Sequence, residues 1–191
     1  MLSTERFLSL TNIVIDNFEG GYYHPDMAKK MKPADQALLA ASGETMFGLD
    51  RKAGAQLAVY PEWKKFWDLT DKADARNKWK HYSLGGVLNA PLKDLAGRIM
   101  YQWFNHLAAK YLNGNSIDKL SADDRLVIHF SYASWNGEGW FKKFAAALNG
   151  AKGTREQIFQ TTLKARTEAS SKAIRNAGAK MMQLFVTLKL K

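Results

Sequence analysis

Residues 4–23 read TERFLSLTNIVIDNFEGGYY and join an amphipathic helical pattern to a glycine break. Within residues 4–18 the apolar side chains recur at the spacing of a helix that buries one face. Gly20 and Gly21 then stop the helix, because glycine is the residue most often found just past a helix end. The stretch therefore predicts a first helix that ends with the carboxyl group of Glu19.

Glu19 has the surroundings of a catalytic acid. A carboxyl group at the end of a buried helix lies against apolar walls, and desolvation there raises its pKa. Tyr22 and Tyr23 follow it, and their flat rings and hydroxyl groups suit carbohydrate. We expect Glu19 to act as an acid beside a sugar-binding cleft. The alternative is an ordinary helix that ends at a glycine, with Glu19 solvated.

The remainder of the chain is predicted to be mainly α-helical. Helices are expected over residues 33–41, 51–58, 61–69, 91–107, 121–132, 140–148 and 155–190. Asp50 is expected to cap the helix over residues 51–58, and the last helix is expected to be interrupted near Gly178. No sustained alternation of apolar and polar residues is present, so we expect at most a small β-hairpin between Tyr22 and Phe47.

The composition excludes several classes of site. The chain has 191 residues, of which 46% are hydrophobic, so it can bury a sizeable core. Because it has no cysteine, it has neither a disulfide framework nor a thiol nucleophile. Its four histidines lack metal-ligand spacing and no phosphate-binding glycine loop is present, so we expect no metal and no cofactor. No secretion signal and no apolar run of the ~20 residues that span a membrane is visible, so we expect synthesis in the cytoplasm.

The positive charge is concentrated at the C-terminal end. The formal net charge is +10, and residues 151–191 hold nine cations against two anions, a balance of +7. We expect a catalytic domain over residues 1–150 and a basic helical extension over residues 151–191 that docks on it. The charge predicts attraction to the anionic bacterial envelope or a membrane surface. No reading helix or aromatic stacking motif is evident, so we expect no specific nucleic-acid partner.

A resemblance to a known family adds detail to this interpretation. The matching residues are Glu19-Gly20-Gly21-Tyr22, His24-Pro25-Asp26 and Gly43-Glu44-Thr45-x-Phe47-Gly48-Leu49. This pattern resembles the N-terminal signature of phage N-acetylmuramidases of glycoside hydrolase family 108, within the lysozyme-like superfamily that includes lytic transglycosylases. The resemblance covers residues 10–50, and extends weakly to Asp123-Asp124 and Trp135-Asn136-Gly137. It implies a lysozyme-like helical domain.

The resemblance also implies roles for individual residues. Glu19 would be the general acid, and Thr45 would position the attacking water. The aspartate that the family carries before its glycine pair is missing from its expected place, so Asp26, Asp35 or Glu44 would replace it. For substrate binding, the implied glycan contacts are Tyr22, Tyr23, Phe47, Trp135 and Asn136.

The implied activity is cleavage of the bond between N-acetylmuramic acid and N-acetylglucosamine in peptidoglycan. A phage would use such a monomeric enzyme to lyse or penetrate the host cell wall, either released from the host cytoplasm or carried in the virion. A lytic transglycosylase is the first alternative: it needs one glutamate and gives 1,6-anhydro products. The missing aspartate favours this alternative, whereas Thr45 favours the muramidase. A non-enzymatic basic protein that binds nucleic acid or builds the virion is the second alternative.

Overall fold

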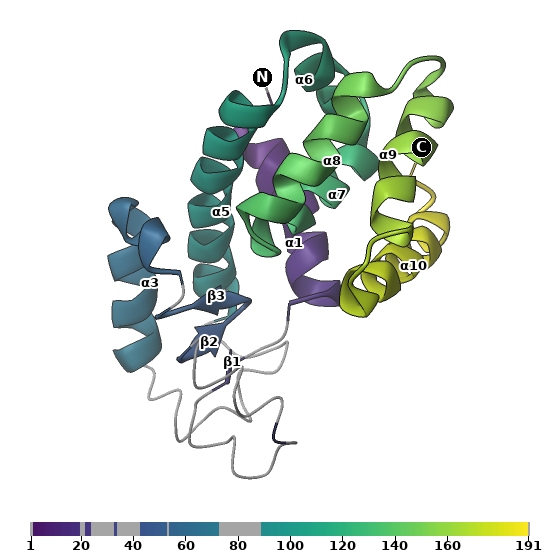
Figure 1. Cartoon of the computed structure of the whole chain (residues 1–191). Helices are drawn as coiled ribbons and strands as arrows, with labels where there is room; N and C mark the ends of the chain where they lie inside the picture. The colour runs from purple at the N-terminus through teal and green to yellow at the C-terminus, as the bar shows by residue number, and fades with distance from the viewer. Residues whose placement is uncertain are drawn as a thin grey trace. The chain divides into compact units, whose positions relative to one another are not determined.

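The computed structural model describes residues 2–19, 22–23, 33, 43–52, 54–72 and 89–190. The chain divides into two compact units. Unit 1 comprises Met1–Thr11 and Trp103–Lys191, and unit 2 comprises Asn12–Gln102. The first and the longest helix, α1 (Thr4–Asn17) and α5 (Asn89–Tyr111), each contribute residues to both units (Figure 1). Each unit is therefore described by itself.

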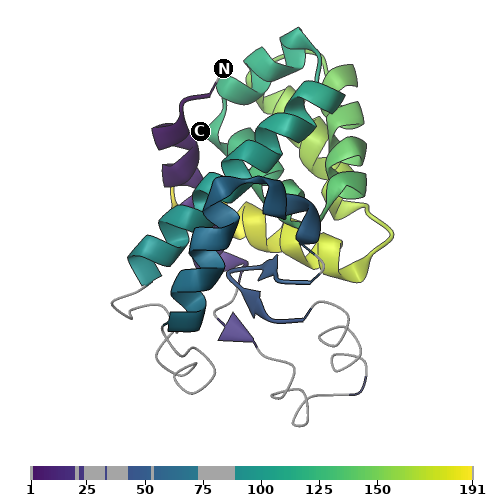
Figure 2. The ribbon, with the colours of Figure 1, turned by 90° about the vertical axis from the view of Figure 1, so that its left-hand side faces the viewer.

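Unit 2 carries the small sheet. Its remaining elements are β1 (Tyr22–Tyr23), β2 (Thr45–Met46), β3 (Leu49–Asp50), the 3-10 helix η2 (Ala55–Val59) and α3 (Pro61–Lys72). In Figure 2 the strands β2 and β3 lie beside α3. The buried apolar side chains of this unit come from all of these helices and from the hairpin: Val14, Ile15, Met46, Phe47, Leu49, Leu57, Trp63, Phe66, Trp67, Leu92, Ala96, Ile99 and Met100.

The sheet is antiparallel with the strand order β1-β2-β3. Strands β2 and β3 form a hairpin in which Thr45 pairs with Asp50. Its two-residue turn is Phe47-Gly48, with φ angles of 48° and 72°. Two left-handed residues in succession are typical of the turn whose twist matches that of the flanking strands. The prediction of a mainly helical fold with a small hairpin is confirmed, and β1 adds a third short strand.

The expected helix over residues 51–58 is wrong in its first half. Asp50 does not cap a helix but ends β3, and the chain then turns tightly into η2. The amide of Gly54 donates to the carbonyl oxygen of Asp50 at 2.7 Å. A Cβ atom at Gly54 would lie 2.5 Å from that oxygen and 2.7 Å from the ring of Trp63. The turn therefore requires glycine, and it moves the helical start to Ala55.

Unit 1 is a bundle of helices around α7. Besides its parts of α1 and α5, it contains α6 (Gly114–Ser121), α7 (Asp124–Trp135), α8 (Glu138–Gly150), α9 (Arg155–Thr167) and α10 (Lys172–Thr187). Side chains of Asn113, Asp123 and Thr154 accept the capping hydrogen bonds of α6, α7 and α9. Helix α7 is buried along most of its length, because α6, α8 and α9 all pack against it.

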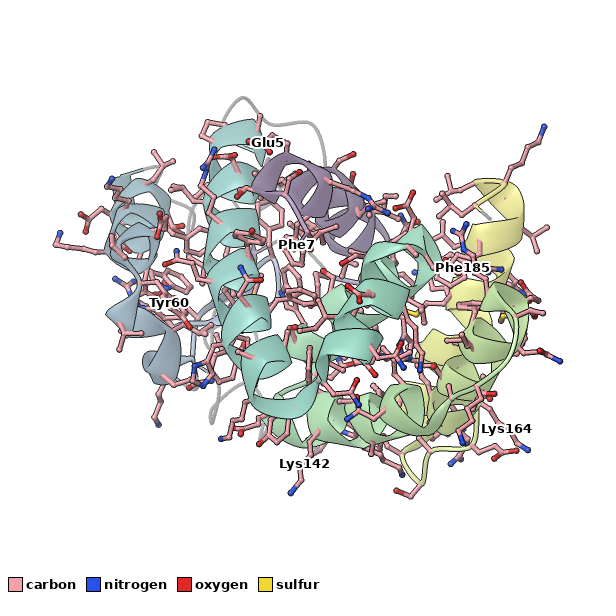
Figure 3. All side chains as sticks on the ribbon, turned by 90° about the horizontal axis from the view of Figure 1, so that it is seen from above. Glu5, Phe7, Tyr60, Lys142, Lys164 and Phe185 are labelled. Atoms are coloured by element: carbon pink, nitrogen blue, oxygen red, sulfur yellow. The ribbon has the colours of Figure 1, made fainter. Side chains whose placement is uncertain are left out.

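A series of phenylalanine ring contacts runs through the core of unit 1. The ring of Phe104 lies 4.9 Å from that of Phe7 and 6.0 Å from that of Phe141, which in turn contacts Phe130 at 5.2 Å. All four side chains are at most 3% exposed. Figure 3 shows Phe7 pointing inward from α1. Tilted and edge-on ring pairs of this kind add to the burial of their apolar area.

The C-terminal segment forms two helices, and the expected interruption near Gly178 is wrong. The break lies between α9 and α10, whereas Gly178 is inside α10. A Cβ atom on Gly178 would lie 3.1 Å from Thr167 Cγ2 and 3.3 Å from Arg166 Cγ. The glycine therefore permits a close approach of α10 to α9 and does not end the helix.

The predicted boundary at residue 150 falls between α8 and α9, which both belong to unit 1. Helix α9 packs on α8, and α10 packs on α9. None of the helices in the described ranges is long and apolar enough to traverse a bilayer.

Candidate active site

Glu19 lies in a turn that closes on the last part of α1. The backbone amides of Phe18 and Glu19 both donate to the carbonyl oxygen of Val14, at 2.8 and 3.3 Å. The side chain of Asn17 donates to the carbonyl oxygen of Ile13 at 2.8 Å. These bonds satisfy carbonyl groups that a helix end leaves without partners. They hold Glu19 at a fixed place on the helix end, partly buried.

The carboxyl group of Glu19 has a strongly perturbed acidity. Burial raises its pKa from an ordinary value of 4.5 to about 8, and the negative charge of Asp50 adds to the increase. Both effects disfavour the ionised form, the first by desolvation and the second by like-charge repulsion. At neutral pH the group is therefore mostly protonated. A carboxyl group in this state can donate a proton, which is the role expected of Glu19.

Asp50 is the second acidic group of the site. It lies on β3 opposite Thr45, and the Thr45 hydroxyl donates to Asp50 Oδ1 at 2.6 Å. Directly opposed residues of an antiparallel pair point to the same face of the sheet, which explains this contact. The hydrogen bond fixes the rotamers of both side chains. The site in unit 2 thus combines a neutral acid, a carboxylate and a hydroxyl group.

Sequence reasoning missed Asp50, because it was assigned to a helix cap. The feature of the sequence that indicates its position is that Asp50 follows Thr45 by five residues. A hairpin with a two-residue turn centred on Phe47-Gly48 pairs these positions, and both then share one face. The signal is weak because Phe-Gly is not one of the pairs typical of such turns, in which Asn, Asp or Gly comes first.

Glu44, one of the three predicted replacements for the missing aspartate, has a different environment. Its carboxylate is 8% exposed and forms an ion pair with Arg51 at 2.6 Å. The guanidinium of Arg51 also pairs with Asp71 of α3 at 2.7 Å and lies 5.0 Å from the ring centroid of Trp67. Arg51 therefore links the start of the hairpin to α3. Because Arg51 neutralises Glu44, we favour Asp50 as the partner of Glu19.

The other site residues predicted from the N-terminal part of the sequence fall into three groups. Asp26 and Asp35 lie outside the described residues. Tyr22 and Tyr23 form β1, of which only the backbone is described. Phe47 is 1% exposed in the hairpin turn, so its ring belongs to the core and has almost no surface to offer a sugar.

Trp135 and Asn136 belong to unit 1, at the end of α7. Trp135 is partly exposed. Asn136 is the C-cap residue of α7, and its side-chain oxygen accepts a hydrogen bond from Arg166 at 3.0 Å. Its amide group is thus partly committed to holding the helix end. That these two residues contact the same glycan as Glu19 stays a prediction.

Unit 1 buries an arginine and a histidine that no sequence pattern indicated. Arg166 is fully buried between the rings of Tyr132 and Phe144, at 4.8 and 4.5 Å, and donates to the carbonyl oxygen of His129 at 3.2 Å. Burial lowers the pKa of Arg166 to about 9. Burial and the charge of Arg166 together hold the pKa of His129 well below 6.5, so its imidazole is neutral. Both groups are core components of the bundle.

The described residues contain no cluster of His, Cys, Asp and Glu side chains that could hold a metal ion. No protein-family model, curated protein or solved structure matches the chain.

Proposed function

We propose that this protein is a peptidoglycan-cleaving enzyme that cuts the glycosidic bond between N-acetylmuramic acid and N-acetylglucosamine. The observation that carries the proposal is the carboxyl group of Glu19, whose pKa of about 8 keeps it protonated beside the charge of Asp50. Two carboxyl groups with different protonation states are what glycoside hydrolysis requires. The resemblance of residues 10–50 to phage muramidases and to the lysozyme-like superfamily supports the choice of substrate.

Each group has a place in the reaction. Glu19 donates its proton to the leaving glycosidic oxygen as the bond from that oxygen to the anomeric carbon breaks. Asp50 stabilises the positive charge that develops at the anomeric carbon. The Thr45 hydroxyl donates a hydrogen bond to Asp50, and its oxygen lone pairs can accept a hydrogen bond from water. That water adds to the anomeric carbon and loses its proton to Asp50, and exchange with solvent restores both carboxyl groups.

The alternative of a lytic transglycosylase uses the same acid. There the 6-hydroxyl of the muramic acid attacks the anomeric carbon, and ionised Glu19 takes the proton from it. That reaction needs no second carboxylate. The presence of Asp50 beside Glu19, bonded to Thr45, therefore favours the hydrolase.

Digestion of purified sacculi tests the proposal. We expect soluble muropeptides with reducing ends by mass spectrometry, whereas 1,6-anhydro ends would select the transglycosylase. Glu19→Gln, which keeps the shape but cannot donate the proton, should lower the rate at least about 100-fold. Glu5→Gln is the matched control, because Glu5 is exposed in the first turn of α1 (Figure 3).

Full activity of Glu19→Gln would contradict the assignment. An absence of released muropeptides, together with strongly salt-dependent binding to DNA, would select the non-enzymatic alternative. We further propose that the enzyme acts as a monomer on the bacterial cell wall during phage lysis or entry.

A further inference from the structure

The outward face of α10 is strongly basic. After Glu168 the sequence contains no acidic residue, and the cations in this part are Lys172, Arg175, Lys180, Lys189 and Lys191. Those of them that the structure describes are all exposed. No carboxylate in the described part of the chain forms an ion pair with Lys172 or Lys189. Lys172 and Lys189 therefore present positive charge to solvent.

The apolar face of α10 is already occupied. Its buried residues are Ile174, Ala177, Met181 and Phe185, and α9 covers them. The rings of Phe159 and Phe185 are 5.7 Å apart, and Figure 3 shows Phe185 on the side of α10 that faces the bundle. An amphipathic helix that has buried its apolar face in the protein cannot also lay that face into a membrane. Any contact with a surface must therefore use the basic side.

Apolar side chains are exposed at the C-terminal end of α10. The described residues include three large exposed hydrophobic side chains, namely Val59, Val186 and Leu188. Val186 is 77% exposed and Leu188 is 42% exposed, and Lys189 follows directly. Val186 is fourteen positions after Lys172, so the helical repeat places both on the same side of α10. Lys172 and Val186 thus share one exposed side of α10, and Leu188 and Lys189 follow at its end.

We propose that this surface, formed by Lys172, Arg175, Val186, Leu188 and Lys189, binds the face of an anionic phospholipid membrane. The cations pair with headgroup phosphates, and Val186 and Leu188 enter the boundary between headgroups and acyl chains. A purely ionic polymer would use the cations alone. The exposed apolar pair beside Lys189 favours a lipid surface, where burying it is favourable. This surface is separate from the residues of the proposed reaction.

Vesicle cosedimentation of the full-length protein tests the proposal. We expect binding to phosphatidylcholine vesicles that contain phosphatidylglycerol, little binding to phosphatidylcholine alone, and weakening as salt is added. The variant Lys172→Glu/Lys189→Glu should weaken binding at least about 30-fold, because each cation lost near an anionic surface removes a factor of about five and each added carboxylate is repelled. Val186→Ser should weaken it about fivefold through lost apolar burial.

The control variant Lys65→Glu/Lys142→Glu makes the same change in net charge with exposed lysines on α3 and α8. Figure 3 shows Lys142 pointing away from α8. This variant should retain nearly all of the vesicle binding. Equal losses in the two double variants would overturn the proposal, as would equal binding to neutral vesicles. The proposal would also be overturned if soluble polyphosphate bound as tightly as the vesicles and Val186→Ser left vesicle binding unchanged. The partner would then be an anionic polymer. Far-UV circular dichroism checks that each variant is folded.

Discussion

The ionisation of Glu19 depends on a neighbour across the chain. The negative charge of Asp50 helps to raise the pKa of Glu19 to about 8, after burial, which is the larger cause. We expect Asp50→Asn to remove the repulsion and so to lower the pKa of Glu19, although not to its ordinary value. Carbon-13 titration of the Glu19 carboxyl group by NMR measures the change. An unaltered titration midpoint of Glu19 in Asp50→Asn would show that the charge of Asp50 does not affect Glu19. Asp50 would then no longer belong to the proposed site.

The burial of Glu19 also lowers the free energy of unfolding at high pH, where its carboxyl group is ionised. Its pKa in the folded protein is raised above that of the unfolded chain, so the folded state binds the proton more tightly between about pH 4.5 and about pH 8. The free energy of unfolding therefore falls as pH rises through this range. Glu19→Gln carries no charge, and we expect it to be more stable than the natural protein at pH 9, by on the order of 2–4 kcal/mol. At pH 4 the difference should vanish, which urea unfolding at both pH values would show.

At the scale of elements, Arg51 connects the hairpin to α3. It pairs with Glu44 and Asp71 and lies over Trp67. We expect Arg51→Met to lower the free energy of unfolding by about 1–3 kcal/mol, mainly because the buried carboxylate of Glu44 loses its partner. Urea unfolding provides the measurement.

A surface ion pair of α3 provides the matched comparison for Arg51. Lys64 pairs with Asp68 one turn away and is 82% exposed. Lys64→Met should change stability by less than about 0.5 kcal/mol, because such pairs contribute little. A loss as large as that in Arg51→Met would show that the effect of Arg51 is not specific to its partners.

Local rules predicted some elements, and packing decided others. The first helix follows from the spacing of its apolar side chains. The helix expected over residues 121–132 begins at Asp124, because the side chain of Asp123 accepts the hydrogen bond that caps α7. The break between α9 and α10 did not follow from sequence, since Gly178 serves a contact between helices and not a helix end. The helix end that carries Glu19 follows from the local pattern. The pairing of Asp50 with Thr45 does not, because it depends on a turn that places Phe47 in the left-handed region.

At the scale of the whole molecule, the net charge should raise the rate of encounter with an anionic substrate. The net charge is +10, while bacterial cell walls carry anionic groups. We expect the rate of sacculus digestion at low substrate concentration to fall as ionic strength rises, because salt shortens the range of attraction to about 10 Å at 0.1 M. The rate at saturating sacculus concentration, where encounter no longer limits it, should be almost insensitive to salt. Equal salt sensitivity at low and at saturating substrate would place the effect in the reaction and not in the encounter.

The two-residue turn at Phe47-Gly48 makes the proposed site vulnerable to a change of chain length. Side chains alternate between the faces of a strand, so one inserted residue that shifted the pairing of β3 would turn Asp50 away from Thr45. Such an insertion would keep every side chain of the proposed site in the sequence and leave the helices intact. Among descendants of this chain, an inactive protein could therefore retain Glu19, Thr45 and Asp50, and the length of this turn would be the better marker of lost activity.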